Sequence, residues 1–438
     1  MTGVQAVAQP TPRERPARSW RSLLASSEVD TRLFGMVAAL AVIWIGFHLL
    51  SGGDFLTARN LWNLSVQSAS IAIMATGMVL IIVSRNIDLS VGSLLGFLGY
   101  VMAMVQTEWI PKSLDLGFDH WYTWIVALAV GILIGAIAGG LQGFIVAYVG
   151  VPAFIVTLGG FLAWRGLIFR FKQGQTLSPL DRTFQLLGGG PRGSLGEWRS
   201  VALGFVACAA IAFTMLLARR RRRRHELALR PVGMDVGLGA IGCAVVVASV
   251  WVANSYPWPE QLARQRVEAR GDVWPEGGIT IPVGIAYPVV VLIVVTLVMT
   301  YLARRRRFGR YVYAIGGNPQ AAELGGINTR RTVMYTFVLM GVLCALSAAV
   351  QTARLNSAVT NLGVQNELDV ISAAVIGGTS FAGGIGTIPG AVLGAVIMQS
   401  LRSGMVTVKV DSPTQDIVVG VVLVTAVALD SWLRRRRT

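Results

Sequence analysis

The stretch VVVLIVVTLVMTYL, residues 289–302, decides the fold class. It is apolar apart from two threonines and a tyrosine, and it does not alternate apolar and polar residues as a strand of a transmembrane barrel does. Backbone groups inside a bilayer have no water to bond, so an apolar run of this kind forms a helix that satisfies its own N–H and C=O groups. The stretch therefore predicts a membrane-spanning helix.

The same pattern recurs along most of the chain. Of the 438 residues, 54% are hydrophobic and 14% are charged, whereas soluble domains carry about 25% charged residues. We predict an all-α, polytopic membrane protein with about 10–12 transmembrane segments. The expected spans lie near residues 33–51, 64–84, 88–107, 122–149, 153–171, 200–218, 235–253, 279–302, 332–352, 368–379, 386–401 and 416–433.

The distribution of arginine predicts which helix ends face the cytoplasm, because Lys and Arg favour cytoplasmic loops. Four arginine-rich segments fall on one side if the N-terminus is inside. They are the tail 1–32, the loop 219–230, the loop 303–331 and the tail 434–438, which leaves 33–433 as the transmembrane domain. Residues 172–199 fit least well, because their basic residues fall on the opposite side. We predict that both termini are cytoplasmic.

The arginine runs have two interpretations. Such a run locks the topology and attracts anionic lipid; a specific protein contact is the alternative. The net charge of +16 is gathered in these loops, which argues against nucleic acid as a partner.

Several kinds of site are not predicted. A Walker A loop needs Gly-Lys-Ser/Thr to hold phosphate, and no lysine here follows a glycine, so we do not expect an ATP-hydrolysing enzyme. The histidines and cysteines lack metal-site or disulfide spacing, and no span holds the cluster of acids and histidines of a proton relay. The lysines are Lys112, Lys172 and Lys409, the histidines are His48, His120 and His225, and the cysteines are Cys208, Cys243 and Cys344.

The loop 303–331 contains a short predicted helix. Asn318 is a suitable N-cap and Pro319 suits the first helical position, while Gly325–Gly326 ends the helix. It is about six residues long, whereas an isolated helix in water needs about 12–15, so something else must hold it. The small Ala321–Ala322 pair would let another protein approach closely. The alternative is a loop that lies flat on its own membrane domain.

Residues 367–401 combine apolar residues with many glycines. Glycine inside a helix costs about 1 kcal/mol relative to alanine, so the segment predicts a broken helix, a close helix crossing, or both. A re-entrant hairpin and two short spans both remain open. Irregular backbone at membrane depth is buried in protein or lines a cavity, which points to a translocation path; tight packing without a transport role is the alternative.

The stretch IIVSRNIDLSVGS, residues 81–93, places an arginine and an aspartate between two apolar runs. We expect Arg85 at the cytoplasmic surface and Asp88 as a cap of the next helix. The small, partly polar face that follows, with Ser90 and Ser93, suits close helix packing or a sugar-lined path. Farther along, Arg165 is expected to extend its charged head to the membrane surface, with a polar contact inside the bundle as the alternative.

Three stretches together resemble a known family. GMVLIIVSRNIDLSVGS at 77–93, YAIGGNPQAAELGGI at 313–327 and AAVIGGTSFAGGIGTIPGAVLGA at 373–395 resemble the permease subunits of bacterial monosaccharide ABC importers, the ribose/xylose/galactose class. The likeness runs from about residue 33 to the C-terminus. VPAFIVTLGGFLAWRGLIF at 151–169 and the region around 219–253 resemble the D-xylose branch. One departure is Arg85-Asn86, where relatives often carry a small residue and an acid or glycine.

The resemblance implies a function and partners. It implies a multi-pass permease of the bacterial inner membrane that forms the path for a monosaccharide, D-xylose, as a homodimer. ATP-binding subunits would hydrolyse ATP, a periplasmic protein would deliver the sugar, and the chain itself would bind no cofactor or metal. A self-sufficient secondary sugar transporter is the alternative, and a membrane scaffold without transport is a third.

Two sets of residues become candidates, the first matched to the family's coupling segment and the second taken from the stretch 81–93 and the glycine-rich segment 367–401. The set for coupling to the ATP-binding subunit is Gly316, Gly317, Asn318, Pro319, Ala321, Ala322, Glu323 and Gly325. The set for the translocation path is Asp88, Ser90, Ser93, Gly377, Gly378, Thr379 and Ser380.

Overall fold

The computed structural model describes residues 31–113, 117–226 and 231–435. The predicted N-terminal tail lies almost wholly outside these residues, as do the last three residues of the C-terminal tail. Within the described ranges the regular structure is helical, and the only β-type pairs are isolated bridges. The helices are α2 Thr31–Leu50, α3 Ala58–Val83, α4 Val91–Met104, α5 Thr123–Phe144, α6 Ala153–Lys172, α7 Arg182–Gln185, α8 Glu197–Arg224, α9 Val232–Asn254, α10 Glu260–Glu268, α11 Tyr287–Arg305, α12 Arg307–Gly317, α13 Pro319–Leu324, α14 Thr329–Leu355, α15 Asn366–Ile376, α16 Ile388–Thr407 and α17 Ser412–Arg435.

These helices confirm the all-α, polytopic membrane class. In the described part of the chain, 7 helices are long and apolar enough to cross a bilayer: α3, α5, α6, α8, α9, α11 and α14. Two further apolar segments, in α2 and α17, are shorter. The predicted count of segments includes these and the helices α4, α15 and α16, which pack within the same bundle.

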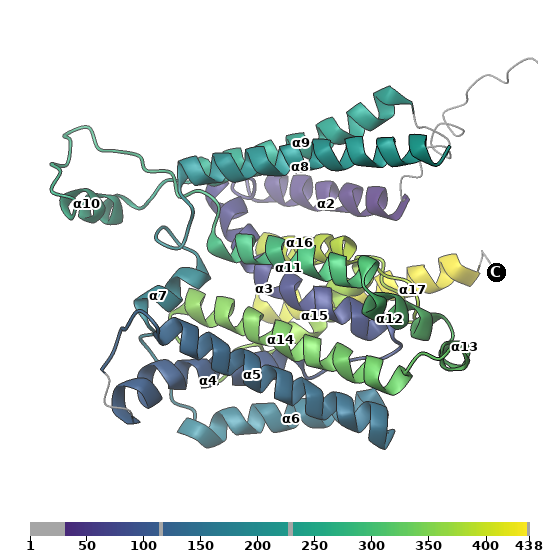
Figure 1. The fold of residues 1–438 in the computed structure, drawn as a ribbon. Coiled ribbons are helices and arrows are strands. Elements are labelled where there is room, and N and C mark those ends of the chain that lie inside the picture. The colour runs from purple at the N-terminus through teal and green to yellow at the C-terminus, as the bar shows by residue number, and fades with distance from the viewer. Residues whose placement is uncertain (1–30, 114–116, 227–230, 436–438) are drawn as a thin grey trace, which may run out of the picture.

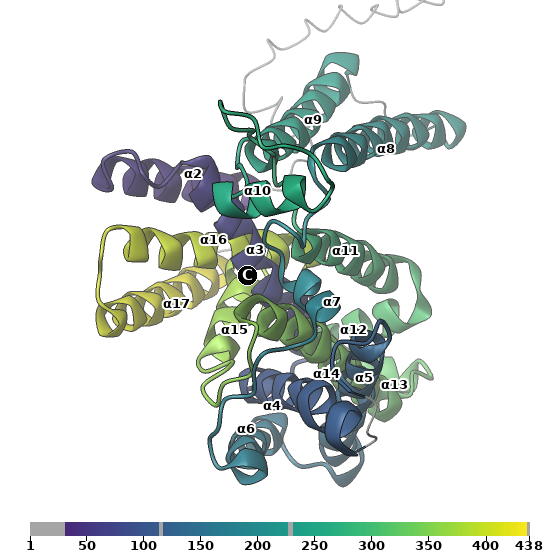
Figure 2. The same cartoon turned by 90° about the vertical axis from the view of Figure 1, so that its left-hand side faces the viewer.

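Helix α3 forms the centre of the bundle. Of its most apolar window, 94% is buried inside the protein, and it contacts α14, α16, α11 and α15. Figure 2 shows these helices arranged around it. An apolar helix buried on all sides belongs to the core of a large bundle, so α3 connects most of the other elements.

Glycines let α5 and α14 pack with their backbones in contact. Gly135 and Gly139 of α5 face the carbonyl oxygens of Gly341 and Phe337 of α14 so closely that any side chain would overlap them. Spacing small residues by four places them on one helix face, which is the usual way for membrane helices to approach closely. This pair builds the rigid side of the bundle below α3 in Figure 1.

Helices α8 and α9 form a hairpin at the edge of the molecule (Figure 1). Only 6% of the apolar window of α8 and 11% of that of α9 are buried. The two helices pack on each other, and Arg219 forms an ion pair with Asp235 at 2.8 Å. Nearly all of the hairpin surface is therefore left for lipid.

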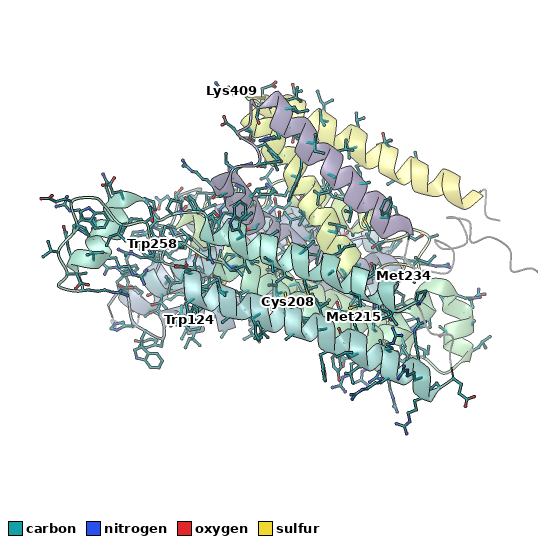
Figure 3. All side chains as sticks on the ribbon, turned by 90° about the horizontal axis from the view of Figure 1, so that it is seen from above. Trp124, Cys208, Met215, Met234, Trp258 and Lys409 are labelled. Atoms are coloured by element: carbon teal, nitrogen blue, oxygen red, sulfur yellow. The ribbon has the colours of Figure 1, made fainter. Side chains whose placement is uncertain are left out.

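The bundle has two chemically different ends. We call one the arginine-rich end: it holds Arg219–Arg224 at the end of α8, Arg304–Arg307 at the α11–α12 junction, and α13. The other, which we call the α10 end, holds α7 and α10. Figure 3 shows Met215 and Met234 toward the arginine-rich end of the hairpin and Trp258 at the α10 end.

The glycine-rich segment contains both features predicted for it, a broken helix and a close crossing. Helix α15 has 11 residues, or about 16 Å at 1.5 Å per residue, which is half of a hydrocarbon core of about 30 Å. A turn with positive φ at Gly378 and Gly383 follows, and α16 returns. Side chains at Gly390 and Gly394 would overlap the carbonyls of α15, so only glycine fits this crossing.

Candidate translocation and coupling sites

A polar cavity of about 230 Å³, open to the surface at the exposed Arg354 and Val364, lies between helices of the bundle in the half nearer the α10 end. Helices α3, α14, α15 and α16 line it with amides, two guanidinium groups and a carboxylate. Its polar residues are Gln67, Ser70, Gln351, Arg354, Gln365, Asn366, Asp369, Gln399 and Arg402. Sites for drug-sized ligands measure about 300–1,000 Å³, so this cavity suits a smaller solute.

Side-chain amides join the helices that form the cavity walls. Gln399 Nε2 of α16 donates to Gln67 Oε1 of α3 at 2.8 Å. Asn366 Nδ2 of α15 donates to Gln351 Oε1 of α14 at 3.2 Å. Each amide has two N–H donors and two acceptor lone pairs, so each pair keeps further groups for the hydroxyls of a solute.

An ion-pair network neutralises charge in the wall between α15 and α16. Arg402 Nη2 lies 2.9 Å from Asp369 Oδ1, and Arg402 Nη1 lies 3.5 Å from Asp416 Oδ1. Gln365 Nε2 donates to Asp416 at 3.0 Å. A charge taken out of water needs a well-placed partner, and both acids here share the guanidinium of Arg402. A second guanidinium, that of Arg354, lines the same cavity, so two cations stand against two acids, which suits an uncharged polyhydroxylated solute.

Arg165 holds the non-helical chain that leads into α15. Its Nη1 donates to the carbonyls of Thr360 and Leu362 at 3.0 and 3.1 Å. The prediction that its head extends to the membrane surface is therefore wrong, and the alternative of a polar contact inside the bundle is confirmed. The two carbonyls belong to non-helical backbone, so they lack helical donors and need this one. Arg165 therefore holds the backbone a few residues before the start of α15.

The first group of predicted path residues lies buried at the start of α4. Asp88 Oδ1 accepts from Ser90 N at 2.9 Å and from Ser90 Oγ at 2.7 Å. Gln142 Nε2 of α5 donates to Ser90 Oγ at 2.9 Å, and Ser93 Oγ donates to the Ser90 carbonyl at 3.0 Å. None of the three predicted residues lines the cavity. Their contacts hold α4 against α5, and their place in the sugar path stays a prediction.

The second group, Gly377 to Ser380, forms the turn after α15. Thr379 N donates to the Ala374 carbonyl at 3.0 Å, and Ser380 N donates to the Ile385 carbonyl at 2.9 Å. Thr379 and Ser380 are buried. This turn lies near the arginine-rich end, away from the lining of the cavity, so its role in the path also stays a prediction.

The cavity residues were not among the predicted path residues. Gln67, Gln351 and Gln399 lie on three different apolar helices, each directly before a serine or threonine, and only the fold brings them together. The signal in the sequence is the polar residue itself, because polar groups inside membrane segments are rare and mark solute pathways. A single such residue does not indicate which helix it faces.

Helix α13 has the bounds predicted for the short coupling helix. Asn318 Oδ1 accepts from Ala321 N at 3.0 Å, which caps the helix, and Pro319 is its first residue. Gly325 forms the C-cap, and Gly326 follows with φ +80. The helix has 6 residues and stands on α12 and α14. Helix α12, which carries Gly316 and Gly317 at its end, was not predicted.

The two alanines of α13 face opposite ways. Ala322 is buried against the protein itself, whereas Ala321 and Glu323 are exposed. The expectation that both alanines present a face to another protein is wrong for Ala322. Leu324, which was not singled out, is 91% exposed. Leu324 is the last residue of α13, so the end of this helix presents a large apolar side chain that the described part of the chain does not cover.

Comparison with known proteins agrees with this architecture. The chain matches the family described as "Branched-chain amino acid transport system / permease component" over residues 60–186 and 183–427. It is 36% identical to a xylose transport system permease protein of Haemophilus influenzae, over 93% of this chain and 98% of the relative. It is 37% identical to the protein of that name in Escherichia coli K12, over 93% and 94%.

More distant relatives and solved structures complete the comparison. The chain is 30% identical to the ribose import permease protein of Escherichia coli K12, over 90% of this chain and 92% of the relative. No solved structure matches the chain. Because the family match covers most of the chain and the xylose permeases align over nearly their whole length, the resemblance seen in the sequence is confirmed. The chain belongs to the branched-chain amino acid transport system permease family and is a membrane-embedded permease component.

Proposed function

We propose that this permease forms the path for D-xylose in an ATP-driven importer of the bacterial inner membrane. Two relatives that are 36% and 37% identical are named xylose permeases, and the ribose permease is 30% identical. The cavity lined by Gln67, Gln351 and Gln399 carries the proposal. Amides and a paired arginine offer donors and acceptors together, which is what the hydroxyls of a neutral pentose require.

The arginine-rich end faces the cytoplasm in this proposal, because positive residues are retained on that side. Helix α13 then faces an ATP-binding subunit, with Ala321, Glu323 and Leu324 as its outer face. The chain itself binds no cofactor, and ATP is hydrolysed in that partner. The predicted coupling residues Gly316 and Gly317 lie directly before α13, and Gly325 lies directly after it.

The α10 end then faces the periplasm and the protein that delivers the sugar. A depression of about 400 Å³ there is lined by Arg192, Arg199 and Arg266 around Trp258 and Glu197. The Arg266 guanidinium lies 4.6 Å from the Trp258 ring centre, which keeps the arginine in place. A basic depression of this kind suits an acidic patch on a sugar-binding protein.

Two further partners belong to the proposal. Two copies of this chain form the membrane part of the importer, as the family resemblance implies. Anionic lipid surrounds the end of α8, where each exposed arginine contributes about 1 kcal/mol. These arginines are Arg220, Arg221, Arg223 and Arg224.

Uptake of labelled D-xylose tests the proposed function. Cells that lack this chain are compared with cells in which it is restored, with unlabelled ribose and galactose as competitors. We expect uptake to be lost and then rescued, and to be little affected by the competitors. If xylose uptake is unchanged and uptake of another sugar is lost, that other sugar is the substrate in place of D-xylose. Xylose transport by the purified chain on an ion gradient, without ATP or an ATP-binding subunit, would instead identify a secondary transporter.

A further inference from the structure

Arg85 joins the coupling segment to the membrane bundle. It lies in the turn after α3, at the arginine-rich end, with φ +63, a value that few residues other than glycine adopt. Its Nε donates to the Gly316 carbonyl at 2.8 Å, and its Nη2 donates to the Gly317 carbonyl at 2.9 Å. These carbonyls end α12 and directly precede Asn318, the cap of α13. One side chain thus binds the base of the proposed coupling helix twice.

A third segment meets the same point. Gly384 N, in the turn between α15 and α16, donates to the Val83 carbonyl at the end of α3 at 3.0 Å. A side chain at Gly316 would overlap that carbonyl, and one at Gly383 would overlap the Arg85 side chain. Three backbone segments, from α3, α12 and the α15–α16 turn, are therefore in direct contact with no space between them.

Three of the four helices that line the polar cavity continue from this joint. Helix α3 carries Gln67, α15 carries Asp369, and α16 carries Gln399 and Arg402. Tyr313 of α12 also binds the α15–α16 turn, because its hydroxyl donates to the Gly386 carbonyl at 2.7 Å. Tightly packed elements move together as units. A displacement of α12 and α13 would therefore also displace α3, α15 and α16, which form three walls of the cavity.

We propose that Arg85 is a positioning residue that transmits the movement of α13 to the cavity helices, so that ATP hydrolysis is converted into sugar movement. The proposal rests on the proposed function. The guanidinium is suited to the task, because its planar fork reaches two carbonyls at once and its charge strengthens both bonds. The carbonyls stand at the C-terminal end of α12, where the helix dipole favours a cation. The side chain is also exposed at the surface that carries α13.

The test uses the complete importer, reconstituted in lipid vesicles with its ATP-binding subunits and its sugar-binding protein. ATP hydrolysis and uptake of labelled D-xylose are measured together for the unmodified complex and for Arg85→Ala, Arg85→Gln and Arg85→Lys. Arg305→Ala is the control, because it removes an exposed arginine at the same end of the molecule, at the end of α11, that is not part of this joint. Assembly is checked by co-purification of all subunits.

We expect Arg85→Ala to assemble and to hydrolyse ATP at a basal rate within about twofold of the unmodified complex, while xylose moved per ATP falls about tenfold, as loss of charge-assisted hydrogen bonds predicts. Arg85→Lys should restore part of the ratio, because an ammonium reaches one carbonyl at a time. Arg305→Ala should leave the ratio unchanged. Arg85→Gln keeps one amide group that can donate to a carbonyl. It replaces Arg85→Ala in the test if the alanine variant does not accumulate in the membrane.

Two results would overturn the proposal. An unchanged ratio of xylose to ATP in the variants would show that Arg85 transmits nothing. A parallel loss of hydrolysis and transport, with less ATP-binding subunit co-purified, would make Arg85 a structural part of the docking surface. The proposed function fails separately: in that case the unmodified complex itself moves no xylose.

Discussion

At the residue scale, some polar side chains inside this bundle form hydrogen bonds with side chains of other helices. Ser70 of α3 and Ser347 of α14 share a hydrogen bond of 2.7 Å, and Trp44 Nε1 of α2 donates to Ser400 Oγ of α16 at 2.9 Å. A polar group without a partner is costly in an apolar interior. These pairs therefore fix the helix contacts, and the removal of one member leaves the other unsatisfied.

Replacing Arg165 should destabilise the start of α15. Arg165→Ala removes both donors from the carbonyls of Thr360 and Leu362, and leaving buried acceptors unpaired costs about 1–3 kcal/mol. Thermal unfolding in detergent should therefore begin at a lower temperature. Arg170→Ala is the matched control, because Arg170 is exposed on the same helix. Equal melting curves for the two variants would remove Arg165 from this role.

A change at Leu324 should separate coupling from folding. The side chain is 91% exposed, so Leu324→Asp leaves the packing of the bundle intact and places a charge on the proposed contact with the ATP-binding subunit. We expect at least a tenfold loss of ATP-driven uptake, since truncating a central apolar contact costs about 2 kcal/mol or more. Protein level and co-purification of the ATP-binding subunit are measured alongside, with Val273→Asp, 89% exposed on the α10 side, as the control. Retention of both uptake and co-purification would exclude α13 as the docking helix.

At the element scale, the sequence predicts an element well where local chemistry specifies it. Asn318 and Pro319 with Gly325 define α13 without reference to the rest of the fold, because caps and end signals act within a few residues. Helix α12 was missed because the prediction of spans depends on long apolar runs, whereas α12 is a short amphipathic helix with buried Val312 and Ile315 on one face. The cavity was missed for a different reason: its lining comes from helices that are distant in sequence.

The crossing of α15 and α16 offers a test at this scale. Gly394→Ala places a methyl group against the carbonyl of Ala373, and overpacking of a close contact costs about 1–3 kcal/mol. Gly420→Ala is the control, because α17 leaves open space at Gly420 and alanine there favours the helix by up to about 1 kcal/mol. We expect the first variant to lower the apparent melting temperature and the second to leave it unchanged or raise it. Equal effects would mean that α15 and α16 can separate at no cost.

At the scale of the whole molecule, the two ends differ in what they offer to partners. The arginine-rich end carries the exposed Arg220–Arg221 and Leu324, and the α10 end carries a basic depression with Trp258. The polar cavity lies closer to the second end and the joint around Arg85 to the first. In the proposed orientation, the sugar would enter at the α10 end and the ATP-binding subunit would act at the arginine-rich end, as an importer requires.

This arrangement requires that the two ends face opposite compartments, which cysteine labelling tests. The background replaces Cys208, Cys243 and Cys344 by serine, and single changes then place a cysteine at Glu323 on α13 or at Gln265 on α10, both exposed positions. A membrane-impermeant maleimide should modify Gln265→Cys in cells whose outer membrane is permeabilised and whose inner membrane is intact. It should modify Glu323→Cys only after the inner membrane is opened, because positive loops stay inside. Retained xylose uptake would show that each variant is folded. The reverse pattern of labelling would show that the chain has the opposite orientation in the membrane. In that orientation α13 could not contact a cytoplasmic ATP-binding subunit.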